Sequence, residues 1–199
     1  LTASSGVSWE TYIGKMILRT PLAETLGDSC LRACGGFSVS LRFWWYIQFP
    51  QEILQQTVLY KKSDKDGRLI SINVLEYLTV IINYCAAYTV ITTEEVTDDP
   101  YPVILNKTDN MSALNWTLHG CKRSRLGRKL SRFFCGLLMG SRVGINSEWI
   151  STTANVIADE ISRLKMESKS ASPFNFPSYD YHLLQQRFLT ELTVCRFFQ

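Results

Sequence analysis

The sequence lacks several features that mark whole classes of protein. It has no basic segment followed by an apolar run and a small-residue cleavage site, so we expect a cytoplasmic or nuclear location and no secretion. No internal repeat is visible. The only two histidines, His119 and His182, are isolated, and no second cysteine pair accompanies Cys30 and Cys34. Because a structural zinc site needs four such ligands at suitable spacing, the pattern argues against zinc.

Long apolar runs are also scarce. The stretch SINVLEYLTVIINY, residues 71 to 84, is interpreted as too short and too interrupted to cross a bilayer, so we expect no membrane partner. Its spacing predicts instead a helix that is buried over most of its circumference. The apolar positions that carry this prediction are Ile72, Leu75, Leu78, Ile81 and Ile82.

A single carboxylate, Glu76, interrupts this apolar helix. An unpaired charge there would be costly, so Glu76 needs a partner. One interpretation is a capping box, in which Asn73 is the N-cap residue and Glu76 reaches back to its amide. The other is that Glu76 faces a cation together with further acids. The spacing alone leaves both open.

The chain has 199 residues, of which 46% are hydrophobic and 12% aromatic, which is enough for one domain with extensions. It begins with Leu1 rather than methionine, and we expect a segment of a longer polypeptide. Its six cysteines are scattered, which suits reduced thiols in a cytosolic or nuclear setting.

The basic residues are unevenly distributed. Between Asn110 and Ser147 there are seven basic residues and no acid, although the net charge of the chain is only +3. On a helix, Arg125, Arg128, Lys129 and Arg132 follow i, i+3, i+4, i+7 spacing. The apolar positions expected to anchor this helix are Leu126, Leu130, Phe133, Phe134, Leu137 and Leu138. A solvated face usually mixes charge signs, so a ridge of one sign favours a phosphate backbone as partner.

Periodicity and turn residues predict strands alternating with helices. Two or three antiparallel strands are expected within 26–50, a helix from about 72 to 90, a strand at 102–107, two helices within 111–142 hinged near Gly120, a strand at 144–151, and a helix at 155–164. In the last helix, Ile157, Ile161 and Leu164 are the predicted buried face. Such alternation implies a partly parallel sheet covered on its faces.

Acidic residues recur at the places where such sheets bind ligands. Asp28 and Asp109 fall at or near the carboxyl ends of predicted strands, where ligands gather in open sheets of this kind. Asp159 lies on the helix after the last strand, and Glu76 on the first long helix. Four separate elements are therefore able to bring one carboxylate each to a common place. Each acid also has a local alternative, such as an i, i+4 ion pair between Asp159 and Arg163.

Four blocks of the sequence resemble one known family. They are GDSCLRACGGFS, INVLEYLTVI, LNKTDNMSALNW and NVIADEISRL, and in this order they are similar to the ribonuclease H domain of retrotransposon reverse transcriptases, with the DIRS-like and related fungal-type elements most similar. The resemblance covers residues 22–164. It implies an α/β fold with a ribonuclease H-like mixed five-stranded sheet flanked by helices. Residues 1–21 would be a helical connector from an upstream polymerase region, and 165–199 a linker with a C-terminal helical tail.

The resemblance also implies a set of site residues. Asp28, Glu76, Asp109 and Asp159 match the family's metal-binding and catalytic acids, which hold two Mg²⁺ ions, with Mn²⁺ as the alternative. The positions implied for nucleic-acid binding are Asn110, Ser112, Lys122, Arg125, Arg128, Lys129 and Arg132. One departure is that Trp149, Ile150, Ser151 and Thr152 stand where many relatives read H-I-P-G, so a histidine that assists product release is missing there.

The expected function is therefore hydrolysis of the RNA strand of RNA/DNA hybrids, giving a 5′ phosphate and a 3′ hydroxyl. The expected partners are the hybrid and the upstream reverse transcriptase domain of the same polyprotein; the sequence does not indicate an oligomeric state. One alternative is a decayed or domesticated module that binds nucleic acid without cutting it. Another is a related nuclease or integrase-like enzyme of the same fold that acts on DNA.

Overall fold

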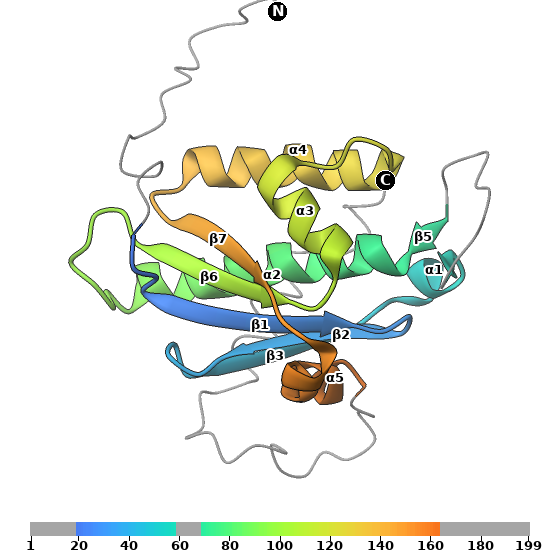
Figure 1. Cartoon of the computed structure of the whole chain (residues 1–199), viewed down its shortest axis with the longest axis horizontal. Coiled ribbons are helices and arrows are strands. Elements are labelled where there is room, and N and C mark those ends of the chain that lie inside the picture. The colour runs from blue at the N-terminus through green and yellow to red at the C-terminus, as the bar shows by residue number, and fades with distance from the viewer. Residues whose placement is uncertain (1–18, 59–68, 164–199) are drawn as a thin grey trace, which may run out of the picture.

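The computed structural model describes residues 19–58 and 69–163 (Figure 1). The predicted N-terminal connector and C-terminal tail fall largely on residues outside these ranges, so the proposed division at residues 21 and 164 stays a prediction. Within the described part, the element order follows the order that the sequence predicts.

Five strands form one mixed sheet. They are β1 (Ala23–Ser29), β2 (Ala33–Ser38), β3 (Phe43–Gln48), β6 (Val103–Thr108) and β7 (Gly144–Trp149). Their order across the sheet is β3-β2-β1-β6-β7. The first three pair as antiparallel neighbours, whereas β1, β6 and β7 run parallel. Two short strands, β4 (Thr57–Val58) and β5 (Ile70–Ser71), form a separate parallel pair. The expected mixed, partly parallel sheet is confirmed.

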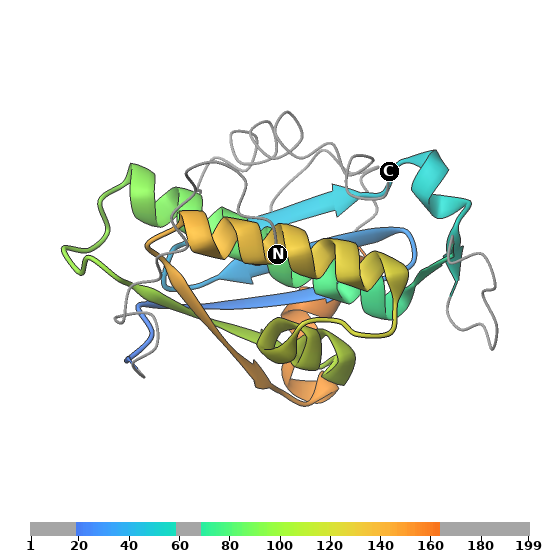
Figure 2. The same ribbon diagram turned by 90° about the horizontal axis from the view of Figure 1, so that it is seen from above.

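Helices cover both faces of this sheet (Figures 1 and 2). The helices are α1 (Gln51–Leu54), α2 (Ile72–Thr93), α3 (Met111–His119), α4 (Arg125–Gly140) and α5 (Val156–Ser162), the last preceded by a 3₁₀ turn at Thr152–Ala154. Helix α2 lies on β1, β2 and β6, with α3 and α4 packed beside it, whereas α5 covers the other face at β1, β2 and β3. Each face has its own hydrophobic cluster, the larger one under α2.

Helix α2 forms the centre of the larger core. It spans 22 residues and, in the described part of the chain, it is long and apolar enough to cross a membrane by length and composition. The interpretation that residues 71 to 84 are too short and too interrupted to cross a bilayer does not hold for the whole helix, which runs to Thr93. In this fold 83% of the most apolar stretch of α2 is buried, so the apolar surface of the helix packs against the sheet and the neighbouring helices.

Two predicted helix faces need correction. On α4, Leu126, Leu130 and Phe134 recur every fourth residue and are buried, but Phe133 is 39% exposed. On α5, the buried positions include Ala158 and Ile161, whereas Ile157 is 37% exposed. In both helices the buried apolar face is narrower than the sequence predicted, because it consists of one line of residues spaced three or four positions apart. Leu164, the remaining predicted position on α5, lies outside the described residues.

Candidate metal centre

Three carboxylates meet at one edge of the sheet. Because β1 and β6 are parallel, their carboxyl ends lie at the same edge. Asp28 is the penultimate residue of β1, Asp109 follows β6 directly, and Glu76 comes from α2 where it packs on β1. Oxygen atoms of these three side chains lie within 4.8 Å of one another. We call this group the carboxylate cluster; it can hold a metal ion.

Glu76 has few protein partners for its charge. Its side chain is 5% exposed, and Oε1 accepts a hydrogen bond from the Ser29 amide at 3.3 Å. Its other oxygen, Oε2, is buried without a hydrogen-bond partner. Such a group is costly to bury unless something satisfies it. The free lone pairs of Oε2 therefore support a ligand at the carboxylate cluster.

The capping-box interpretation of Glu76 is wrong. The N-cap of α2 is Ser71, and it makes no side-chain capping hydrogen bond. Asn73 instead accepts a hydrogen bond on Oδ1 from Asn110 Nδ2 at 3.1 Å. Asn73 thus links α2 to the residue that follows Asp109, which is a contact that sequence spacing does not reveal.

The carboxylates of the cluster oppose one another's ionisation. Burial raises the pKa of Asp28 to about 6, the hydrogen bond from Ser162 lowers it, and the nearby Asp109 and Asp159 raise it. Burial also raises the pKa of Glu76 well above its usual value, with further contributions from Asp28 and Asp109. A cation bound between these groups would reverse this effect, since it favours the ionised forms. Three hard oxygen donors suit Mg²⁺, Mn²⁺ or Ca²⁺ better than zinc.

Asp159 stands apart from the other three predicted acids. Among the described residues, the carboxylate oxygens that lie within 4.8 Å of one another do not include those of Asp159. Its side chain is 34% exposed and forms an i, i+4 ion pair with Arg163, as the local alternative anticipated. Asp159 nevertheless lies close enough to contribute to the raised pKa of Asp28.

Helix α5 reaches the carboxylate cluster through Ser162, a residue that sequence reasoning missed. Its hydroxyl donates to Asp28 Oδ2 at 2.7 Å, and its side chain is nearly fully buried. Ser162 follows Asp159 by three residues and so lies on the same side of the helix. That i, i+3 spacing from Asp159 is the signal in the sequence that could have identified it.

Asn110 and Ser112, predicted to contact substrate, lie directly beside the cluster. Asn110 is the N-cap of α3, and its Oδ1 accepts hydrogen bonds from the amides of Ser112 and Ala113 at 2.9 and 3.0 Å. This cap begins the helix immediately after Asp109 and so fixes the backbone of that acid. Contact with substrate stays a prediction.

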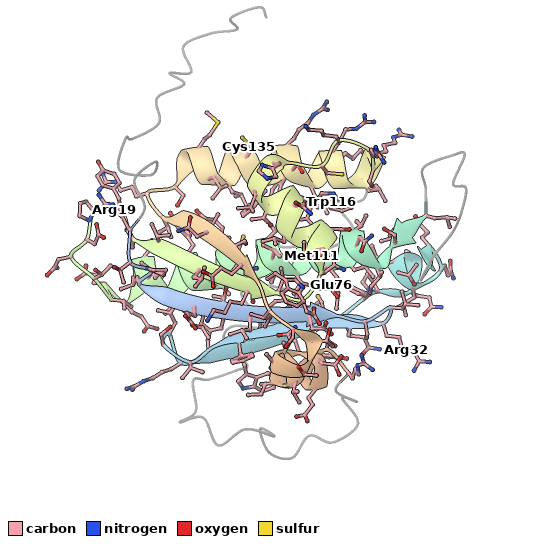
Figure 3. The ribbon with its side chains drawn as sticks, in the orientation of Figure 1. Arg19, Arg32, Glu76, Met111, Trp116 and Cys135 are labelled. Carbon is pink, nitrogen blue, oxygen red and sulfur yellow. The ribbon has the colours of Figure 1, made fainter. Side chains whose placement is uncertain are left out.

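The predicted basic ridge lies on α4 and the turn before it. Lys122, Arg125, Arg128 and Arg132 are exposed, and Lys129 is half-buried. Among the described residues, no acidic side chain is paired with the four exposed ones. Figure 3 shows nitrogen-tipped side chains that project from the N-terminal half of α4 away from the sheet. This charge is therefore available to an anionic partner.

Comparisons with protein-family models, with curated proteins and with solved structures found no match to this chain. The functional interpretation of the carboxylate cluster therefore depends on its own geometry and chemistry and on the sequence resemblance.

Proposed function

We propose that this protein is a metal-dependent endoribonuclease that hydrolyses the RNA strand of RNA/DNA hybrids as part of a retroelement reverse transcriptase. The observation that carries the proposal is the convergence of Asp28, Glu76 and Asp109 within 4.8 Å at the carboxyl end of β1 and β6. The mixed five-stranded sheet flanked by helices is compatible with the ribonuclease H-like fold that the resemblance implies.

The carboxylate cluster suits a hard divalent cation, and we propose that it binds two Mg²⁺ ions, with Mn²⁺ as the alternative. Two buried carboxylates with raised pKa values and the unpartnered Glu76 Oε2 support this proposal, because a bound cation would satisfy all three. By the resemblance, Asp28 would help to hold both ions, with Glu76 and Asp109 on the leaving-group side. Asp159 would complete the nucleophile side, which requires it to release or share its ion pair with Arg163.

The protein's own groups bind and orient the hybrid in this proposal. The exposed arginines of α4 bind the phosphates of one strand, while the carboxylate cluster faces the strand that is cut. Ser162 holds Asp28 through its 2.7 Å hydrogen bond, and the Asn110 cap holds the backbone next to Asp109. Bound divalent ions supply an activated water nucleophile and stabilisation of the leaving 3′ oxygen.

A second candidate is a decayed or domesticated module that binds hybrids without cutting them. The position of Asp159 favours it, because an acid that is paired with Arg163 and outside the cluster leaves three ligands where the family has four. Both candidates predict hybrid binding that weakens with salt. They differ in metal-dependent cleavage.

The proposal is tested with a labelled RNA/DNA hybrid, with and without Mg²⁺ or Mn²⁺. We expect the wild-type protein to cut the RNA strand only with metal, and Asp109→Asn to abolish cutting while circular dichroism shows an unchanged fold. The matched control is Asp98→Asn, the same change at an exposed residue outside the cluster, which is expected to keep full activity. A wild-type protein that binds hybrid but stays inert with both metals would favour the non-catalytic module. Cleavage of duplex DNA in a parallel assay would favour the DNA-acting alternative.

A further inference from the structure

An exposed tryptophan lies beside the carboxylate cluster. Trp149 is the last residue of β7 and pairs in register with Thr108, the last residue of β6. Its indole Nε1 donates a hydrogen bond to the backbone oxygen of Asp109 at 3.1 Å. Even so, 52% of the residue is exposed to solvent.

Two exposed apolar residues lie near Asp109, one of the acids of the carboxylate cluster. The large hydrophobic residues that are exposed in the described part of the chain are Val39, Val96, Met111, Leu118, Phe133, Met139, Trp149, Val156 and Ile157. Of these, Met111 follows Asp109 by two residues, and Trp149 is hydrogen-bonded to its carbonyl. Met111 is the first residue of α3, which packs against α2, the helix that carries Glu76. The carboxylates thus have an apolar border on one side.

The indole of Trp149 is held in a fixed orientation. The amide of Ile150 donates to the carbonyl of Thr108 at 3.0 Å, so the ladder between β6 and β7 continues past the residue. The indole N–H is already used by Asp109, which leaves the ring face as the surface that Trp149 offers to a partner. A ring that is held in advance loses little conformational freedom when it makes a contact.

The sugar surface of a hybrid matches this ring face. A hybrid with A-like geometry has a wide, shallow minor groove that presents ribose carbons and 2′ hydroxyls to a protein. Aromatic side chains stack on nucleic-acid bases without sequence preference. The same flat apolar face is able to pack against the carbons of a ribose. Trp149 is exposed and hydrogen-bonded to the backbone of Asp109, so a strand whose phosphate reaches the carboxylate cluster would pass close to it.

We propose that Trp149 is a substrate-positioning residue, whose exposed indole face packs against the ribose of the strand held at the carboxylate cluster. This proposal rests on the proposed function, because it takes the hybrid as the ligand. The indole N–H fixes Asp109, and the ring face sets how far the bound strand sits from Asp28, Glu76 and Asp109. Trp149 therefore contributes to affinity before any metal binds.

Two substitutions in the full chain separate these roles. Trp149→Phe keeps an aromatic face and removes the indole N–H, whereas Trp149→Ala removes both. The control is Val39→Ala, which shortens an exposed residue between β2 and β3. Hybrid affinity is measured by fluorescence anisotropy in EDTA, and kcat and KM are measured with Mg²⁺. We expect Trp149→Ala to weaken binding and raise KM about tenfold, Trp149→Phe to keep most of the affinity, and Val39→Ala to have no effect.

Two outcomes would overturn the proposal. Trp149→Ala with wild-type affinity would show that the ring face makes no contact, and Trp149→Phe as weak as Trp149→Ala would assign the effect to the N–H alone. The measurement of hybrid affinity in EDTA does not depend on catalysis. A wild-type protein that binds hybrid but never cuts it would therefore end the proposed function and leave the Trp149 comparison decisive. A wild-type protein that binds no hybrid would overturn both.

Discussion

Individual carboxylates decide how this site responds to pH. The folded state raises the pKa of Asp28 from 3.8 to about 6, mainly through burial. A shift of that size corresponds to about 3 kcal/mol lost from folding stability when Asp28 is ionised. The folded protein holds the proton on Asp28 more tightly than the unfolded chain does. The folding stability that this protonated form provides is therefore fully present below about pH 4, and it is lost as the pH rises through about 6. Near neutral pH the cluster therefore reduces stability unless a cation offsets its charge.

Removing the charge of Glu76 is predicted to stabilise the protein in the absence of metal. Glu76→Gln should raise the unfolding temperature in EDTA at neutral pH by several degrees, because a neutral amide escapes the burial that disfavours the carboxylate. The same variant should lose the stabilisation that Mn²⁺ or Mg²⁺ gives the wild type. Thermal unfolding followed by circular dichroism measures both effects.

Glu52→Gln, an equal change at an exposed position on α1, serves as the control and should shift neither value. An EDTA unfolding temperature for Glu76→Gln at or below that of the wild type would contradict the interpretation of Glu76 as an uncompensated buried acid.

Ser162 is predicted to tune the pH at which metal binds. Metal affinity in the wild type should fall as the pH drops through about 6, since protonation of Asp28 competes with the ion. Ser162→Ala removes the hydrogen bond that lowers the pKa of Asp28, so the midpoint should move to higher pH. Calorimetric titration of Mn²⁺ at a series of pH values measures the shift. A midpoint that stays in place, or moves to lower pH, would show that Ser162 has only a packing role.

At the scale of elements, the site depends on how closely α2 approaches β1. A Cβ atom added at Gly27 would lie 2.6 Å from both Asn83 Nδ2 and Thr79 Cγ2 of α2. Glycine at this position lets the helix lie near enough to the strand for Glu76 to reach the Ser29 amide. The distance between these two elements therefore sets the geometry of the carboxylate cluster.

Gly27→Ala is accordingly predicted to destabilise the protein by about 1–3 kcal/mol, because α2 must move away from β1. It should also weaken Mn²⁺ binding, since Glu76 moves with the helix. The matched control is Gly136→Ala on α4, where an added Cβ meets nothing within 4 Å. That change should leave stability the same or raise it by about 0.5–1 kcal/mol, because alanine favours a helix. Urea unfolding separates the two variants, and equal effects would refute the close-approach argument.

At the scale of the whole molecule, charge is separated along the fold. The net charge is +3, yet α4 and the turn before it carry a run of basic residues with no acid, while the carboxylate cluster is acidic. A molecule of nearly balanced charge that binds a polyanion does so through a local surface, not through its average field. Under the proposed function, the exposed side of α4 is that surface.

Neutralising this surface is predicted to change the salt dependence of hybrid binding. Each of Arg125→Gln, Arg128→Gln and Arg132→Gln should reduce the slope of log K against log salt by up to about 1 if the side chain contacts a phosphate. Arg42→Gln, an exposed position in the turn between β2 and β3, is the control and should leave the slope unchanged. Anisotropy titrations over a range of salt concentrations measure the slopes. Slopes that match the wild type in all three variants would place the hybrid elsewhere.

The sequence by itself determined the order of the elements and much of their extent. Strands at β1 to β3, β6 and β7, the helix pair hinged near Gly120, and the basic row on α4 all follow from periodicity and turn residues. These signals are local, because residues a few positions apart along the chain share one face of a helix or strand. The positions of Asp28 and Asp109 at strand ends follow from the same patterns.

Only the tertiary structure decided which side chains meet. The amide that binds Glu76 lies 47 residues away, and the hydroxyl that binds Asp28 lies 134 residues away. Local spacing left a capping partner open for Glu76 and gave Asp159 equal standing with the other acids, yet α5 brings Ser162 to the cluster and leaves Asp159 with Arg163. The rotation of a helix about its axis is set by packing against the sheet, and this rotation decides which residue points inward.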